Sequence, residues 1–149
     1  MNIDASSTSP GRVVVGVDGS PASIQALRWA LNYARVTRSA TEVIVAWDGR
    51  PNLSWTFLAP SDCGPEMSAE QALDRLIEQL RAECPNQLIE GRVVQGHAEP
   101  LLVEASEGAD LLVVGSRGHG ELVGFVIGSV SEYCATNAHC PVVVHKAAA

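Results

Sequence analysis

The 149-residue sequence predicts an α/β fold, in which an open sheet of five parallel strands carries helices on both faces. The first observation is that short valine-rich segments alternate with helical patterns along the chain, which is typical of parallel sheets. The second is that residues 12–18 and 110–114 are continuously apolar, as expected of central strands covered on both sides. The third is that all connections but one are short, which fits right-handed crossovers. We therefore expect one domain over residues 11–149, after a polar, flexible tail at 1–10.

Each element follows from a local signal. The first strand, 12–18, is stopped by Gly19, and a helix to about residue 38 begins with Ser20 as N-cap and Pro21 at its first position. Further strands are predicted at 41–48, 88–95, 110–114 and 140–145, and further helices at 69–84, 100–107 and 129–138. The third strand alternates polar and apolar residues, which places it near an edge of the sheet. The long loop 49–67 is interpreted either as a cover over the site or as a surface excursion.

Composition excludes several classes of function. The net charge is −7 and cations form no cluster, which argues against nucleic-acid binding. No apolar run is long enough for a membrane span, and the polar start has no signal region, so we expect a cytoplasmic protein without a membrane partner. The four cysteines are far apart and form no C-x-x-C pair, so neither a zinc site nor a disulfide framework is predicted. Cys134 and Cys140 are expected to pack as small hydrophobes.

A glycine-rich segment follows the fourth strand and reads GSRGHGELVGFVIGSVSE. Glycines there let backbone N–H groups approach a phosphate closely or adopt positive φ. Gly128 and Ser129 stand at a helix start, where unpaired N–H groups favour an anion, and Ser129 with Glu132 predicts a capping box. The sequence has neither a G-x-x-x-x-G-K-[ST] pattern nor a G-x-G-x-x-G fingerprint after the first strand. The segment therefore indicates a phosphate site of another kind.

Three segments of the sequence are distinctive when taken together. They are the spacing from Gly115 and Gly118 to Gly128-Ser129, the opening VVVGVDGSPAS with Asp18, and the closing GSVSEYCATNAHCPVVVH. All three resemble the ATP-binding universal stress proteins. The resemblance covers residues 11–146 and implies the strand order 3-2-1-4-5. In that order the first and fourth strands are neighbours, and the carboxyl ends of strands at such a switch point are where open α/β sheets bind ligands.

The resemblance also implies which residues bind ATP. They are Val17, Asp18, Ala46, Gly115, Ser116, Arg117, Gly118, Gly128, Ser129 and Val130. The glycines and Ser129 would hold ribose and phosphates, Ala46 would meet adenine through its backbone, and Val130 would pack beneath the nucleotide.

Two side chains in that set have open roles. Asp18 would lie beside the ribose or a phosphate-bound Mg²⁺, the alternative being a turn aspartate that caps the first helix. Arg117 is interpreted either as the cation near the phosphates or as a solvated side chain.

The sequence favours a binding module for stress response or signalling, with an unidentified regulatory protein partner. It shows no assembled general base, nucleophile or cation cluster, and slow ATP hydrolysis or another nucleotide-dependent reaction is the alternative. A phospho-receiver is rejected because the third strand ends at Gln95-Gly96, without an acidic acceptor. A flavin fits the topology but suits the glycine pattern less well than a triphosphate. The apolar edge strand Pro141–His145, which has no lysine, predicts a homodimer.

Overall fold

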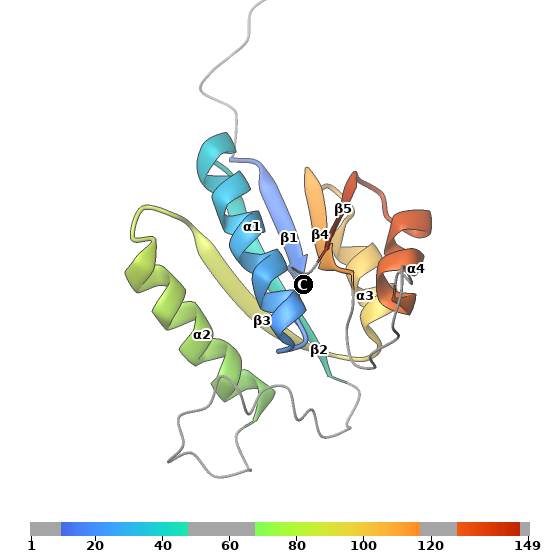
Figure 1. Ribbon diagram of the computed structural model, residues 1–149, viewed down its shortest axis with the longest axis horizontal. Helices are drawn as coiled ribbons and strands as arrows, with labels where there is room; N and C mark the ends of the chain where they lie inside the picture. Colours follow the sequence, from blue (N-terminus) through green and yellow to red (C-terminus); the bar gives the residue numbers. More distant parts are fainter. Residues whose placement is uncertain (1–9, 48–67, 117–127, 147–149) are drawn as a thin grey trace, which may run out of the picture.

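The valine-rich segments form a five-stranded parallel sheet in the order β3-β2-β1-β4-β5, which confirms the predicted topology (Figure 1). The computed structural model describes residues 10–47, 68–116 and 128–146. The strands are β1 (Arg12–Gly16), β2 (Ala40–Trp47), β3 (Ile89–Gln95), β4 (Leu111–Gly115) and β5 (Val142–His145). Residues 1–9 of the predicted tail (1–10) and the whole of the predicted loop 49–67 lie outside the described residues.

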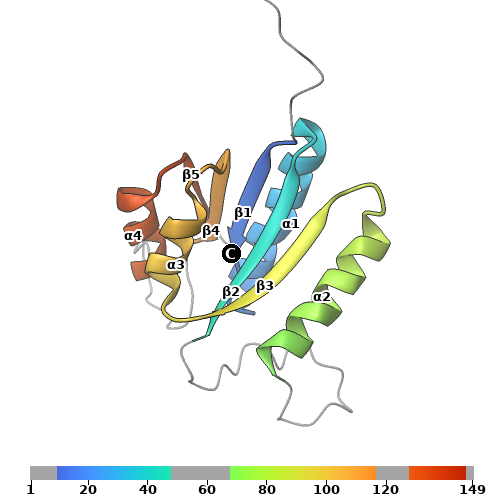
Figure 2. The ribbon, with the colours of Figure 1, turned by 180° about the vertical axis from the view of Figure 1, so that it is seen from behind.

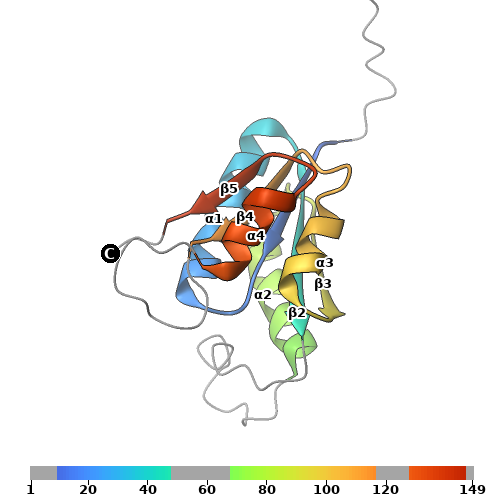
Figure 3. The ribbon, with the colours of Figure 1, turned by 90° about the vertical axis from the view of Figure 1, so that its right-hand side faces the viewer.

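In the described part of the chain, four helices cover the sheet in two layers. They are α1 (Pro21–Thr37), α2 (Ala69–Glu83), α3 (Ala98–Ala105) and α4 (Ser129–Asn137). Helices α1 and α2 pack on one face, and α3 and α4 pack on the other, as the two opposite views show (Figures 1 and 2). The side view, with β5 toward the reader, separates α1 from α3 across the sheet (Figure 3). None of the described helices is both long and apolar enough to span a membrane.

The central strand β1 joins two hydrophobic cores. Val13 and Val15 belong to the core beneath α1 and α2, whereas Val14 belongs to the core beneath α3 and α4. All three side chains are fully buried. The continuous apolar sequence of β1 is therefore explained by the helices that cover it on each face, as the sequence predicted.

Helix boundaries agree with their sequence signals at α1 but not at α3. At α1, Ser20 is the N-cap, and its Oγ accepts from the N–H of Ser23 at 3.2 Å. The prediction that α3 begins at Pro100 is wrong, because the helix begins at Ala98 after the positive-φ turn at Gly96. Pro100 then occupies the first helical turn, where a missing N–H breaks no intrahelical hydrogen bond.

Leu102 tests the core on the α3 side. Leu102→Ala should lower the free energy of unfolding by about 2–5 kcal/mol, because it removes a side chain that is 97% buried against β1 and leaves a cavity. Leu88→Ala, at a side chain that is 63% exposed, should change it by less than about 0.5 kcal/mol. Urea unfolding of both variants measures the difference, and equal losses would contradict this packing.

The Cys134 thiol tests burial by pH. Cys134 is fully buried in α4, and burial, with a smaller contribution from Glu99, raises its pKa to about 11 from an ordinary 9.0. As the pH rises, the thiol of the unfolded chain ionises before the buried thiol of the folded protein. The free energy of unfolding is therefore unaffected below pH 9 and falls as the pH rises from 9 to 11. Cys134→Ala should reduce this alkaline loss, measured by urea unfolding across the range, and Cys84→Ala should retain it. An unchanged alkaline slope in Cys134→Ala would contradict the assignment.

Candidate functional site

The carboxyl edge of the sheet brings together predicted site residues from three strands. In the ladders, Gly16 pairs with Ile44 and Val15 pairs with Val113. Counting onward along these registers places Asp18, Ala46 and Ser116 at one level of the edge. Strands β1 and β4 are neighbours there, while their following helices turn to opposite faces. The predicted residues of these strands therefore meet at the topological switch point.

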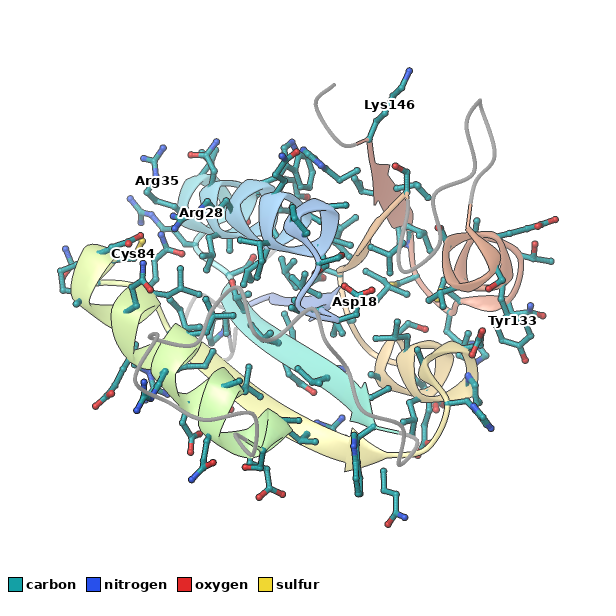
Figure 4. All side chains as sticks on the ribbon, turned by 60° about the horizontal axis from the view of Figure 1, so that its bottom comes forward. Asp18, Arg28, Arg35, Cys84, Tyr133 and Lys146 are labelled. Carbon is teal, nitrogen blue, oxygen red and sulfur yellow. The ribbon has the colours of Figure 1, made fainter. Side chains whose placement is uncertain are left out.

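Asp18 is held in a fixed turn between β1 and α1. Its Oδ1 accepts hydrogen bonds from the backbone N–H of Ser20 at 2.9 Å and from Ser20 Oγ at 2.5 Å. Its own N–H donates to Oγ of the buried Ser23 at 3.3 Å, and Gly19 supplies the positive φ of the turn. Asp18 thus orients Ser20, and Ser20, not Asp18, is the N-cap of α1. Figure 4 shows Asp18 among the strand ends, with Lys146 pointing away from it.

Val17 and Ala46 offer different groups to this edge. The Val17 side chain is 4% exposed and belongs to the core beneath α1 and α2, while its N–H donates to the carbonyl of Ile44 at 2.9 Å. Ala46 is half-buried and forms the last pair but one between β2 and β3, just before Trp47. A ligand would therefore meet Val17 through its backbone, and Ala46 through a methyl group or backbone.

The start of α4 is attached to the end of β4 by two hydrogen bonds. The N–H of Gly128 donates to the carbonyl of Ser116 at 2.9 Å, and the hydroxyl of Ser131 donates to the carbonyl of Gly115 at 3.1 Å. Ser131 is buried, and Val130 packs against the core on the same side. Sequence reasoning missed Ser131, although a small hydroxyl one turn into a helix is a recognisable signal. These contacts fix the helix start beside the strand end.

The predicted capping box at Ser129 and Glu132 is wrong. Gly128 is the N-cap, with extended backbone at φ −62° and ψ 160°, and Ser129 is already the first helical residue. A capping hydroxyl must stand one position earlier, where this chain has no side chain. The N–H groups of Ser129, Val130 and Ser131 have no hydrogen-bond acceptor among the described residues. The positive end of α4 is therefore uncapped by the described part of the chain.

Close approach of the backbone explains Gly115, and neither Gly115 nor Gly128 needs a left-handed backbone. Gly128 has a negative φ, and Gly115 is not among the described glycines with positive φ. A Cβ on Gly115 would lie 3.3 Å from the carbonyl oxygen of Ala22, in the first turn of α1. Gly115 therefore lets the end of β4 pack against the start of α1.

Arg117 and Gly118, both predicted to contact phosphates, lie outside the described residues. Within residues 10–47, 68–116 and 128–146, no group of three or more His, Cys, Asp or Glu side chains is arranged to hold a metal ion. The described part of the edge thus contributes one carboxylate, several backbone N–H groups and a helix N-terminus.

Comparison with known proteins identifies the family. The model of the universal stress protein family matches residues 10–146. Universal stress protein Rv2624c of Mycobacterium tuberculosis is 33% identical over 135 residues, which cover 90% of this chain and 47% of that protein. Universal stress protein MJ0531 of Methanocaldococcus jannaschii is 28% identical, with 91% of this chain and 81% of that protein covered. The chain spans about half the length of the mycobacterial relatives it matches.

Solved structures agree with this assignment. Universal stress protein UspA from Lactobacillus plantarum has a TM-score of 0.71 at 19% identity, covering 93% of this chain and 99% of that one. A universal stress protein crystallised in complex with cAMP has a TM-score of 0.62 at 28% identity, covering 93% and 98%. Because the family model spans nearly the whole chain and the strand order is the one expected, this chain belongs to the universal stress protein family.

Proposed function

We propose that this chain binds ATP at the carboxyl edge between β1 and β4 and acts as a cytoplasmic stress-response or signalling module, without efficient catalysis. One observation carries the proposal: the first-turn N–H groups of α4 have no acceptor among the described residues and are fixed beside the end of β4. Such a helix start is a ready site for a phosphate, since the N–H groups and the helix dipole both favour an anion.

Relatives support an adenine nucleotide as the ligand. The structural relative with 28% identity was crystallised with cAMP. Two more distant members of the fold, at 22% and 21% identity, were crystallised with AMP and dAMP. Within the adenine nucleotides we propose ATP in particular, because of the glycine spacing from Gly115 to Ser129.

Different residues of this edge would contact the phosphates, the ribose and the base of the nucleotide. The N–H groups of Ser129 and Val130 would bind phosphate, with the backbone of Gly115 and Ser116 beside the ribose. The backbones of Val17 and Ala46 would face the base. Arg117 and Gly118 complete the proposed set from outside the described residues.

Asp18 fits a role next to a nucleotide-bound Mg²⁺. Its carboxylate is positioned by Ser20, and a carboxylate oxygen is a hard ligand that suits this ion. When bound, the ion would neutralise phosphate charge, which a chain of net charge −7 needs at this edge. The alternative partner of the carboxylate is the ribose.

Two variants test the site. Asp18→Asn keeps an oxygen for Ser20 but removes the charge, and it should weaken ATP binding in Mg²⁺ about tenfold. Gly128→Ala is permitted by its negative φ, yet its methyl group would obstruct the phosphate, so ATP should be lost while cooperative unfolding remains. Asp74→Asn, at an exposed position of α2, is the matched control.

Calorimetric titration and the nucleotide content of the purified protein provide the measurements. Unchanged ATP affinity in both site variants would refute the assignment. Chromatography of the nucleotide over time separates binding from slow hydrolysis, the alternative function at the same edge.

The proposed module is a homodimer that pairs through β5. This edge strand has four half-buried residues, Val142–His145, and Pro141 stands before it. An apolar edge needs a partner or a cover, and a two-fold axis would pair two such edges at once. The mycobacterial relatives, about twice as long as this chain, have room for two such units.

Val143→Lys tests the dimer. A charged side chain on β5 should shift the protein to monomer, or to aggregate where the exposed edge pairs unspecifically. Val36→Lys is the control, because Val36 is already 69% exposed at the end of α1. Sedimentation measures the mass, and circular dichroism verifies the fold of each variant. A wild-type monomer at micromolar concentration would exclude this interface.

A further inference from the structure

A cavity lies away from the switch point, on the face of the sheet that carries α3. It has a volume of about 290 Å³ and is lined by residues of β1, β2, β3 and α3. The lining residues are Arg12, Ile44, Arg92, Val94, Leu101, Glu104 and Ala105. Figure 2 shows this face, where α3 packs against β1 and β2, α4 packs against β4 and β5, and no described helix lies over β3. The cavity therefore opens beside α3 on the less covered half of the sheet.

An ordered ionic cluster bounds one end of this cavity. The carboxylate of Glu42 is shared by two guanidinium groups, with Oε2 at 2.9 Å from Arg12 and Oε1 at 2.9 Å from Nε of Arg92. Arg12 also donates to the carbonyls of Ala105 at 3.0 Å and Glu107 at 2.8 Å, at the carboxyl end of α3. Most of the hydrogen-bonding capacity of Arg12 is thus used within the protein.

The guanidinium group of Arg92 is held in one orientation but keeps hydrogen-bond donors that no described residue uses. Its Nε is held by Glu42, while its two terminal nitrogens donate to no described residue. The side chain is 55% exposed, so a ligand can reach these groups. A guanidinium held at Nε presents a planar pair of N–H donors that matches the two oxygens of a carboxylate. Arg92 is therefore an anion-binding group whose direction is set by its neighbour.

The rest of the lining is apolar, except for one rim carboxylate. Ile44 and Ala105 are buried, whereas Val94 and Leu101 are half-buried and border the open space. Glu104, on α3, is exposed and lines the cavity. With Glu42 included, two cations face two anions, so recognition of an anion here depends on the hydrogen bonds that Arg92 can donate and not on surplus positive charge.

We propose that this cavity binds a small monocarboxylate with an apolar body, such as a short-chain fatty acid. The carboxylate would lie against the terminal nitrogens of Arg92, and the hydrocarbon chain against Val94 and Leu101. The volume is near the lower limit of small-molecule sites, roughly 300 Å³, so the occupant is short. The site is separate from the proposed nucleotide site and does not depend on it.

Hexanoate is the probe, titrated into the full-length protein at millimolar concentration. Methyl NMR should show saturable shifts at Val94 and Leu101. Arg92→Gln should weaken hexanoate about tenfold, as expected for a lost charge-assisted pair. Glu104→Gln should tighten it about two- to threefold by removing a repulsive charge from the rim. Arg75→Gln, on α2 at the opposite face, should leave the affinity unchanged.

Three results would overturn the proposal. One is the absence of saturable shifts in the wild type, and another is an equal affinity of the folded Arg92→Gln variant. The third is binding of hexanol or hexylamine as tight as that of hexanoate, which would show an apolar hollow without carboxylate recognition. Because Glu104 is exposed, its variant keeps the test available if Arg92→Gln fails to fold. Unchanged hexanoate affinity in Glu104→Gln would then count against the proposed rim.

Discussion

The complete burial of β1 is the constraint on which the rest of this structure depends. Val13, Val14 and Val15 are fully buried between β2 and β4, with a helix layer on each face. Such a strand is stable only if both layers form, because either face left in water would expose valines. The two cores, one beneath α1 and α2 and one beneath α3 and α4, are therefore linked through a single strand.

The same arrangement places polar backbone where an anion can use it. Helix α1, which follows β1, packs on one face of the sheet, and α4, which follows β4, packs on the other, so neither of these helices covers the strand ends between them. Asp18 and the start of α4 are held there by serine hydroxyls, from Ser20 and Ser131. An acidic chain can bind a phosphate at such an edge because N–H groups supply positive potential without a cationic side chain.

The sequence predicted the parallel sheet because continuous valine runs, helix starts and short connections all agree. Ser20-Pro21 correctly located the start of α1, since its hydroxyl and ring act locally. The strand order was not available from periodicity, and came from the family resemblance. The capping box at Ser129 was wrong because the pattern does not reveal which residue leaves the helical conformation, and here that residue is Gly128. The ionic cluster around Glu42 joins residues far apart in the chain, so no local pattern indicated it.

The pairing of β1 with β4 also determines when the sheet and its two cores can form during synthesis. Val13 pairs with Leu111, so β1 waits until nearly the whole of this domain has been synthesised before its pairing with β4 can form. Such non-local parallel pairing slows folding, since loop closure precedes any gain from contacts. Until then α1 is the nearest cover for Val13 and Val15, while Val14 has none until α3 and α4 follow. A valine strand covered on one face only exposes apolar surface, and such surface in an incomplete chain is prone to aggregate.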